Sequence, residues 1–258
     1  MYAVNSLDRE RLDEFSEFML GSISKIFTSL IILILDQEGK LNIDDQVVTF
    51  LKSTRYDMRT VKITDLMNHV SGLKKHWDSA IVPRKKYRNA TVIMQRVFDD
   101  DPKLFEYEPG EFHYSNVGYL MLTAIIEAVT GRSYVDVYTE YIFAPLSMTN
   151  TGVGETNITL YNGRYRPLTR KEFLERYEAV GAGAFYTCVH DMLLFAKRWK
   201  RLVHPNRMKL LDFCRDMPDG TVKIAHRGTI YGGTSTVSMV YSQDWKFVSM
   251  KLKFLAIN

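Results

Sequence analysis

Apolar residues dominate one long segment near the start of the chain. Residues 22–37 form this segment, and the glycine at position 39 closes it, so a helix is predicted here. Apolar positions cover most sides of the helix, so we expect it to lie at the centre of the core. A second apolar stretch predicts a helix that starts at Asn116 and is ended by Gly131, and a third helix is predicted over 189–202.

The pattern changes towards the C-terminus. Segments 222–226, 234–241 and 246–255 are rich in β-branched and aromatic residues, which predicts strands. Gln243 and Asp244 between the last two segments suit a hairpin loop. These two strands should therefore pair in antiparallel fashion.

Helices followed by an antiparallel sheet indicate the α+β class. We expect a single domain over residues 1–258, with a helical body at about 22–202 and C-terminal strands at about 221–256. Within the body, Thr64 is predicted to cap a short helix.

Composition and charge narrow the classes of function. The chain has 258 residues, of which 46% are hydrophobic and 25% charged, as is usual for a globular protein. Its net charge of +4 is too small to indicate a nucleic-acid partner, and the basic clusters at 84–88 and 197–201 are interpreted as solvated surface. The longest apolar run, 30–35, is too short for a membrane span.

The N-terminus and the cysteines bear on the compartment. Residues 1–15 lack a basic region followed by an apolar one, and they are too acidic for an ordinary transit peptide. Cys188 and Cys214 have no metal-ligand spacing and are expected to be free thiols. We therefore expect an intracellular protein, cytoplasmic or mitochondrial, without a signal peptide or a metal site.

Two serine–lysine pairs have helical spacing, Ser22 with Lys25 and Ser71 with Lys74. Positions i and i+3 share one face of a helix, so the amine can take the proton of the hydroxyl. Ser22 begins the long apolar helix, where unpaired N–H groups and the helix dipole favour an oxyanion. Ser71 precedes Gly72 at a helix end, where the dipole has the wrong sign, so we interpret it as a turn residue.

A lysine acts as a base only where its pKa is lowered. The ordinary value is about 10.4, and a neutral lysine at pH 7 costs roughly 4–5 kcal/mol unless burial or a nearby cation offsets this. Tyr114, two residues before Asn116, is a candidate to share the proton transfer. His226, Arg227 and Gly228 on the first predicted C-terminal strand form a third group, in which the glycine allows a substrate close to the strand.

Order and spacing of the three groups resemble the serine β-lactamase-like and penicillin-binding-protein-like hydrolases. The likeness lies in the branch of class C enzymes, DD-peptidases and related esterases, and is nearest to the animal mitochondrial LACTB-type proteins. It covers roughly residues 18–255 and includes the segments 66–73, 109–119 and 181–185. The resemblance implies a β-lactamase/transpeptidase-like fold.

The resemblance also implies a role for each residue of the motifs. Ser22 would be the acylated nucleophile, and Lys25 together with Tyr114 would accept its proton. Asn116 would hydrogen-bond the substrate amide or the lysine. His226 would tune the charge of the site.

The implied reaction is acyl transfer to the serine, followed by hydrolysis of the acyl-enzyme. The backbone N–H groups of Ser22 and Thr229 would form the oxyanion hole. The substrate would be a small peptide, ester or β-lactam-like amide, and no metal or organic cofactor would be needed.

Two departures from the family pattern support an alternative. Arg227 stands where relatives usually carry a small Thr or Ser, and its guanidinium could bind a substrate carboxylate or fill the acyl pocket. The elements before Ser22 and after the last strand are also shortened, which leaves an open sheet edge. The alternative is a catalytically silent scaffold that self-associates, as the filaments of LACTB-type relatives suggest.

Overall fold

The computed structural model describes most of the chain, namely residues 3–4, 11–53, 60–77, 89–153, 161–162, 166–167, 180–230 and 233–256. The basic cluster at 84–88 lies outside the described residues. The second cluster ends helix α8 (Val189–Arg198) and continues in the turn η4 (Trp199–Arg201). Its two lysines and Arg201 are exposed while Trp199 is buried, so this cluster is a solvated helix face as predicted.

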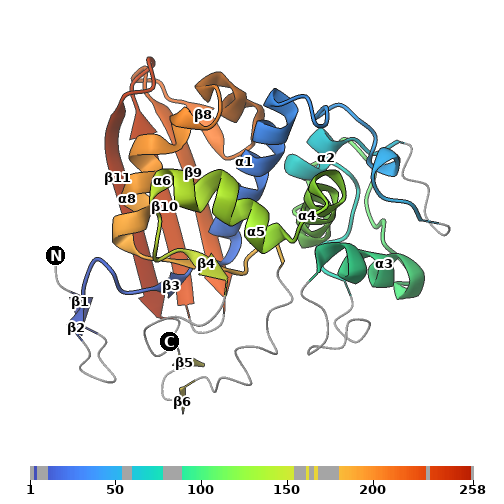
Figure 1. The fold of residues 1–258 in the computed structure, drawn as a ribbon, viewed down its shortest axis with the longest axis horizontal. Coiled ribbons are helices and arrows are strands. Elements are labelled where there is room, and N and C mark those ends of the chain that lie inside the picture. Colours follow the sequence, from blue (N-terminus) through green and yellow to red (C-terminus); the bar gives the residue numbers. More distant parts are fainter. Residues whose placement is uncertain are drawn as a thin grey trace.

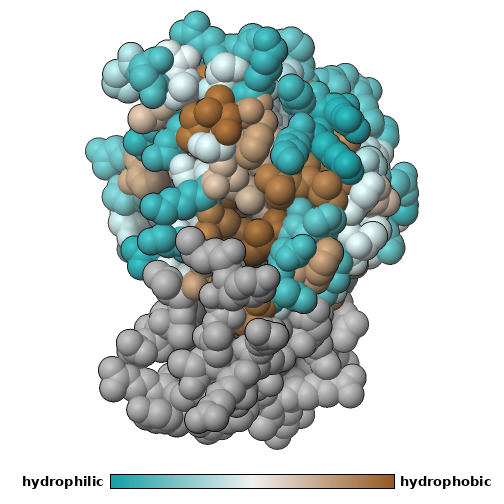
Figure 2. Space-filling view, turned by 90° about the vertical axis from the view of Figure 1, so that its left-hand side faces the viewer, coloured by the Kyte–Doolittle hydropathy of each residue, from teal (hydrophilic) through white to brown (hydrophobic). Residues whose placement is uncertain are grey.

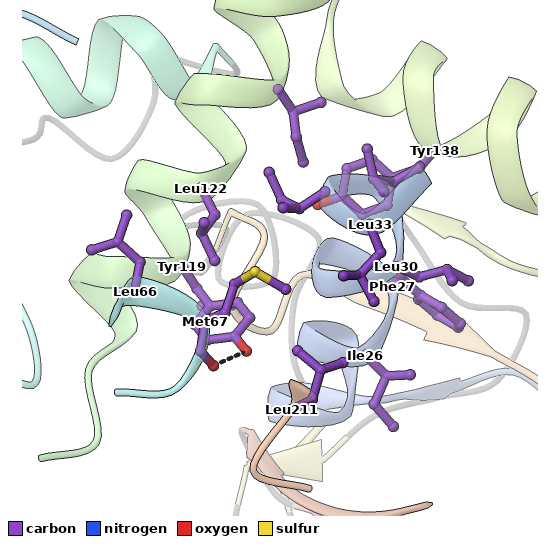
Figure 3. Close-up of a cluster of buried hydrophobic side chains, with 14 of the residues drawn as sticks. Ile26, Phe27, Leu30, Leu33, Leu66, Met67, Tyr119, Leu122, Tyr138 and Leu211 are labelled. Carbon is purple, nitrogen blue, oxygen red and sulfur yellow. Dashed lines mark hydrogen bonds between the residues drawn. The ribbon is translucent and has the colours of Figure 1, made fainter. Parts of the chain in front are cut away.

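The long apolar segment forms the central helix. A single 3-10 turn, η1 (Gly21–Ile23), leads into α1 (Ser24–Gln37), and all side chains from Ser24 to Leu35 are buried. The segment is helical as predicted, although its first turn is tighter than an α-helix. Figure 3 shows part of the core around this helix. Side chains of α1 (Ile26, Phe27, Leu30 and Leu33) lie among side chains from other elements, namely Leu66, Met67, Leu122, Tyr138 and Leu211.

Helix α4 (Asn116–Thr130) packs against α1. The Ser115 side chain caps its start by accepting the N–H of Gly118, and Gly131 ends it in the left-handed conformation with φ 66°. The helix starts at Asn116 and ends at Gly131 as predicted. Serine supplies a capping oxygen, and glycine adopts positive φ without strain.

The other helical elements of the body are short. They are η2 (Val47–Thr49), α2 (Ile63–Met67), α3 (Ala90–Asp100), α5 (Tyr134–Tyr138), η3 (Thr139–Phe143), α6 (Ala144–Leu146) and η5 (Pro205–Leu210). The prediction that Thr64 caps α2 was wrong, because the cap position is Lys62. The Lys62 N–H donates to Asp65 Oδ2 at 2.8 Å, which satisfies the helix start in another way.

A four-stranded antiparallel sheet follows, in the order β11-β10-β9-β8. Its strands are β8 (Cys214–Asp216), β9 (Val222–Ile230), β10 (Gly233–Tyr241) and β11 (Phe247–Ala256). The predicted antiparallel hairpin of the last two strands is confirmed. Pairing of β8 with β9 reaches only to Ile224, so the rest of that edge of β9 is not covered by β8.

Smaller sheets were not predicted. One joins β3 (Phe18–Met19), β7 (Phe185–Thr187) and β4 (Gly152–Val153), and two-residue strands pair as β1 (Ala3–Val4) with β2 (Arg11–Leu12) and β5 (Tyr161–Asn162) with β6 (Arg166–Pro167). Two or three residues are too few for a hydrophobic pattern to be recognised.

The four-stranded sheet and the helical body lie side by side (Figure 1). The sheet stands at the left of the view, α1 beside it, and α2, α3 and α4 beyond α1. The β9 strand contacts η1, so the start of the central helix meets the sheet. Within the described residues, no helix has both the length and the apolar character needed to cross a bilayer.

Strand β11 is one edge of the large sheet. Figure 2 views the molecule from this side and shows apolar residues gathered between polar ones. Val248 is exposed by 56%, and Lys251 and Lys253 are also exposed. Lysines on an edge strand oppose the pairing of that edge with another strand.

Candidate active site

The predicted serine, lysine, tyrosine and asparagine meet at the start of α1. Lys25 Nζ lies 3.3 Å from Ser22 Oγ and donates to Asn116 Oδ1 at 2.7 Å. The Tyr114 hydroxyl donates to Ser22 Oγ at 2.6 Å. Since two of these residues precede or begin α4, the packing of α4 against α1 brings the group together.

Lys25 is completely buried. A third contact of its Nζ is with the carbonyl oxygen of Ala182, at 2.8 Å. The Nζ also lies 4.9 Å from the ring centroid of Tyr114 and 5.1 Å from that of Tyr119. Burial lowers the pKa of Lys25 well below its ordinary value, and the negative charge of Asp212 counteracts part of this. The neutral amine that a base requires is therefore favoured by the position of the residue.

Tyr114 is partly buried between the lysine and a histidine. Burial raises the pKa of its hydroxyl to about 12, although the hydrogen bond to Ser22 acts in the opposite direction. At neutral pH the side chain is thus a phenol that donates to the serine oxygen. A phenol cannot accept the serine proton, so the Lys25 amine is the candidate acceptor.

The second serine–lysine pair is arranged differently. Lys74 Nζ forms a 2.6 Å ion pair with Asp101 Oδ1, and the aspartate side chain is completely buried. Ser71 lies in the bend before Gly72, whose φ is 77°. The structure therefore agrees with the interpretation of Ser71 as a turn residue.

Strand β9 approaches the turn η1 as closely as glycine permits. A Cβ atom added to Gly228 would lie 1.9 Å from the carbonyl oxygen of Leu20, and one added to Gly21 would lie 3.0 Å from Thr229 N. The same Leu20 oxygen accepts a hydrogen bond of 2.6 Å from Ser235 Oγ. The space next to Gly228 is therefore filled by the main chain at Leu20 and not left open for a substrate. The glycine allows β9 to pack closely on η1.

His226 and Arg227 follow one another on β9 and differ in exposure. Burial lowers the pKa of His226 to about 4, and the charge of Lys25 lowers it further. Its Nδ1 lies 2.9 Å from the Arg227 carbonyl oxygen, and its ring is 5.7 Å from the ring of Phe213. The imidazole is therefore neutral at pH 7, whereas the Arg227 side chain is exposed.

Two histidines beside the site were not predicted. His69 Nδ1 accepts the N–H of Ser115 at 3.1 Å, and its ring centroid lies 4.5 Å from that of Tyr114. His76 Nδ1 lies 3.2 Å from the amide nitrogen of Asn116. Both contacts join segments more than 35 residues apart (His69 to Ser115 is 46 and His76 to Asn116 is 40), and no local pattern signals such contacts.

The burial of His69 predicts how stability depends on pH. Burial lowers its pKa to about 3 from an ordinary value of 6.5, so the unfolded chain binds a proton more readily than the folded one. Its contribution to the free energy of unfolding is therefore fully present above pH 6.5 and is lost as the pH falls, with a slope that approaches about 1.4 kcal/mol per pH unit. Urea unfolding between pH 7 and 4.5 measures the total slope, to which His226 also contributes, and a variant of His69 isolates its share.

His69→Asn keeps an acceptor for the Ser115 N–H and removes the titrating group. We expect a smaller slope in this variant and the wild-type slope in His204→Asn, which changes an exposed histidine. Equal slopes in the two variants would show that His69 is not the responsible group.

Within the described part of the chain, no three His, Cys, Asp or Glu side chains are grouped to hold a metal ion.

Comparison with known proteins finds one family model and several relatives that match this chain. A family model described as Beta-lactamase matches residues 2–229. Penicillin-binding protein 4* of Bacillus subtilis is 35% identical over 159 residues, which cover 59% of this chain and 32% of that protein. Teichoic acid D-alanine hydrolase of Staphylococcus aureus is 30% identical over 185 residues, 68% of this chain and 44% of that protein. The chain thus matches less than half the length of these curated relatives.

Solved structures share the fold at lower identity. The penicillin-binding protein from Bacillus halodurans has a TM-score of 0.72 at 20% identity, covering 96% of this chain and 83% of that one. The D-amino acid amidase from Ochrobactrum anthropi SV3 has a TM-score of 0.71 at 20% identity, covering 95% of this chain and 78% of that one. The octameric penicillin-binding protein homologue from Pyrococcus abyssi has a TM-score of 0.71 at 23% identity, covering 96% of this chain and 63% of that one.

These structures confirm the predicted α+β, β-lactamase/transpeptidase-like fold. The relatives named above include a D-alanine hydrolase and a D-amino acid amidase, so hydrolases are among them. Because the family model matches most of the length of this chain, the chain belongs to the Beta-lactamase family.

Proposed function

We propose that the protein is a serine hydrolase that cleaves an ester or amide bond through an acyl-enzyme on Ser22. The observation that carries this proposal is the pair of contacts at the serine oxygen. Tyr114 donates to it at 2.6 Å and the buried Lys25 Nζ lies 3.3 Å away. A nucleophile needs a base within hydrogen-bond reach, and burial supplies a lysine suited to that task.

In the first step, Ser22 Oγ bonds to the carbonyl carbon of the substrate, and the hydroxyl proton passes to Lys25 Nζ. The oxyanion is bound by the N–H groups of Ser22 and Thr229, each worth about 10²–10³ in rate. The tetrahedral intermediate then expels the leaving group. Tyr114 gives that group its proton and regains one from Lys25.

In the second step, water attacks the acyl carbon and gives one proton to Lys25. The ester bond to Ser22 Oγ breaks, and the serine oxygen regains a proton as the acid leaves. His226, neutral at pH 7, adds no second positive charge next to the lysine. Asn116 holds Lys25 Nζ through its Oδ1 at 2.7 Å.

Two observations support a D-aminoacyl ester or amide as the substrate. A curated relative is a teichoic acid D-alanine hydrolase, and one structural relative is a D-amino acid amidase.

Arg227 supports a further feature of the substrate. Its exposed guanidinium could bind an anionic group at the edge of the site.

Labelling of Ser22 tests the proposal. A fluorophosphonate should form one covalent adduct, detected by intact mass and mapped to Ser22. Lys25→Met should lower the second-order rate of labelling by at least about 100-fold, because the proton of the serine then lacks its acceptor. Lys40→Met, which changes an exposed lysine, should label at the wild-type rate. A folded protein that forms no adduct would contradict the proposal.

The second candidate, a silent protein that self-associates, is favoured by one finding. A structural relative is octameric, as its description states. The exposure of Arg227 argues against blockage of the acyl pocket. Light scattering that finds a monomer, together with turnover that depends on Ser22, would exclude this candidate.

The nearer likeness to LACTB-type proteins and the intracellular location stay predictions.

A further inference from the structure

Asp212 is a charged residue beside the site that no sequence motif marks. It precedes β8, and its neighbours Leu211 and Phe213 are buried. Its N–H donates to Asn68 Oδ1 at 3.1 Å, and the carbonyl oxygen of Phe213 accepts the N–H of Ala225 at 3.0 Å. The backbone at Asp212 is therefore held from two sides.

This backbone lies close to the start of α1. Figure 3 shows Leu211 next to Ile26, one residue after Lys25. The negative charge of Asp212 raises the pKa of Lys25 and of Tyr114, and the charge of Lys25 acts on Asp212 in return. The carboxylate thus shares the electrostatic environment of the candidate nucleophile.

One oxygen of this carboxylate has an unmet hydrogen-bonding capacity. Asp212 Oδ1 is shielded from solvent and has no hydrogen-bond partner among the described residues. Lys25 directs its Nζ to Ser22, Asn116 and Ala182. Burial raises the pKa of Asp212, and the charge of Arg215 together with main-chain N–H groups offsets only part of this rise. A buried acceptor in this state is costly, and a donor brought by a ligand would relieve the cost.

We propose that Asp212 binds the ammonium group of the substrate, which makes esters or amides of amino acids with a free amino group the preferred substrates. This inference rests on the proposed function and assigns the specificity of the same site. It requires that the substrate supply N–H donors to Oδ1. An amino acid ester does so through its ammonium group, with a charge opposite to that of the carboxylate.

An N-acylated substrate would bind less well for two reasons. Its amide has no positive charge, and its single N–H is a weaker donor to a carboxylate than an ammonium group. A site whose buried polar group is left unpaired discriminates strongly against such an analogue. The discrimination should therefore depend on the charge at position 212.

Kinetics with two matched substrates test this inference. The probes are D-alanine p-nitroanilide and its N-acetyl derivative, and the quantity is the ratio of their kcat/KM values. We expect a ratio in favour of the free amine, lowered by about 10- to 100-fold in Asp212→Asn and partly kept in Asp212→Glu. Asp216→Asn removes an equal charge from an exposed position of β8 and should keep the ratio.

A different role of Asp212 has a different outcome. If the carboxylate only stabilises the charged form of Lys25, Asp212→Asn changes the pH profile for both substrates alike and leaves the ratio unchanged. An unchanged ratio would overturn the inference. It would leave the proposed function intact as long as turnover depends on Ser22.

Binding without turnover separates the two proposals. In the Ser22→Ala background, calorimetry should find tighter binding of D-alaninamide than of N-acetyl-D-alaninamide, and this preference should disappear when Asp212→Asn is added. If no Ser22-dependent turnover exists but the preference does, the proposed function fails and the ammonium site stands. Equal affinities for the two ligands in Ser22→Ala would refute the ammonium site, whether or not the double variant folds.

Discussion

Ser22→Ala should lower kcat/KM for ester or anilide hydrolysis by at least about 10⁴-fold. In the proposed mechanism the substitution removes the atom that forms the acyl-enzyme, and only the oxyanion donors and substrate binding then remain. Lys25 and Tyr114 cannot compensate, because both act on the proton of this one hydroxyl. Stopped assays on purified protein, with the melting temperature as a check of folding, measure the loss.

Ser71→Ala is the matched control, since Ser71 also precedes a lysine by three positions. It should retain wild-type turnover because Lys74 is paired with Asp101 and not with the serine. Residual activity of Ser22→Ala near the wild-type level would mean that another group is the nucleophile.

Gly228→Ala should destabilise the protein by about 2–4 kcal/mol and remove most of its activity. The new Cβ would lie 1.9 Å from the Leu20 carbonyl oxygen and 2.7 Å from Ser235 Oγ, so β9 and η1 must move apart. Backbone atoms cannot rotate away as a side chain can. The movement would also displace Thr229 N from the serine. Urea unfolding and kcat together measure both effects.

Gly39→Ala separates packing from backbone strain. Gly39 has a φ of 69° and nothing within 4 Å of an added Cβ. This variant should lose only about 1 kcal/mol, the cost of a positive φ for alanine, and should retain kcat. Equal losses of stability in the two variants would contradict the close approach of β9 to η1.

Periodic segments with clear end signals could be predicted from the sequence. The α4 helix is an example, because Ser115 and Gly131 have the chemistry that each helix end requires. The last three strands were also predicted, since β-branched residues and a polar hairpin loop are local features. The candidate site residues Ser22, Lys25, Tyr114 and Asn116 could be grouped from the sequence because their motifs have a known order, and the folded chain brings them into contact.

Contacts between distant segments could not be predicted in this way. Asp212 and His69 matter through neighbours that only the folded chain brings near. The start of α2 was misplaced because Thr64 is a good capping residue, yet Asp65 satisfies the N–H of Lys62 instead. Gly228 was interpreted as room for a substrate, because no local pattern shows that the Leu20 carbonyl oxygen occupies that space.

The position of the proposed nucleophile at the start of the central helix affects how such a protein evolves. Ser22 lies in the turn that leads into the buried helix α1 and Lys25 lies in its first turn, whereas Arg227 and His76 are exposed. Substitutions at exposed positions seldom affect folding, but substitutions in a core helix commonly do. A lineage can therefore exchange its substrate through the exposed residues with little loss of stability, while the proposed catalytic pair is protected by the same selection that maintains the fold.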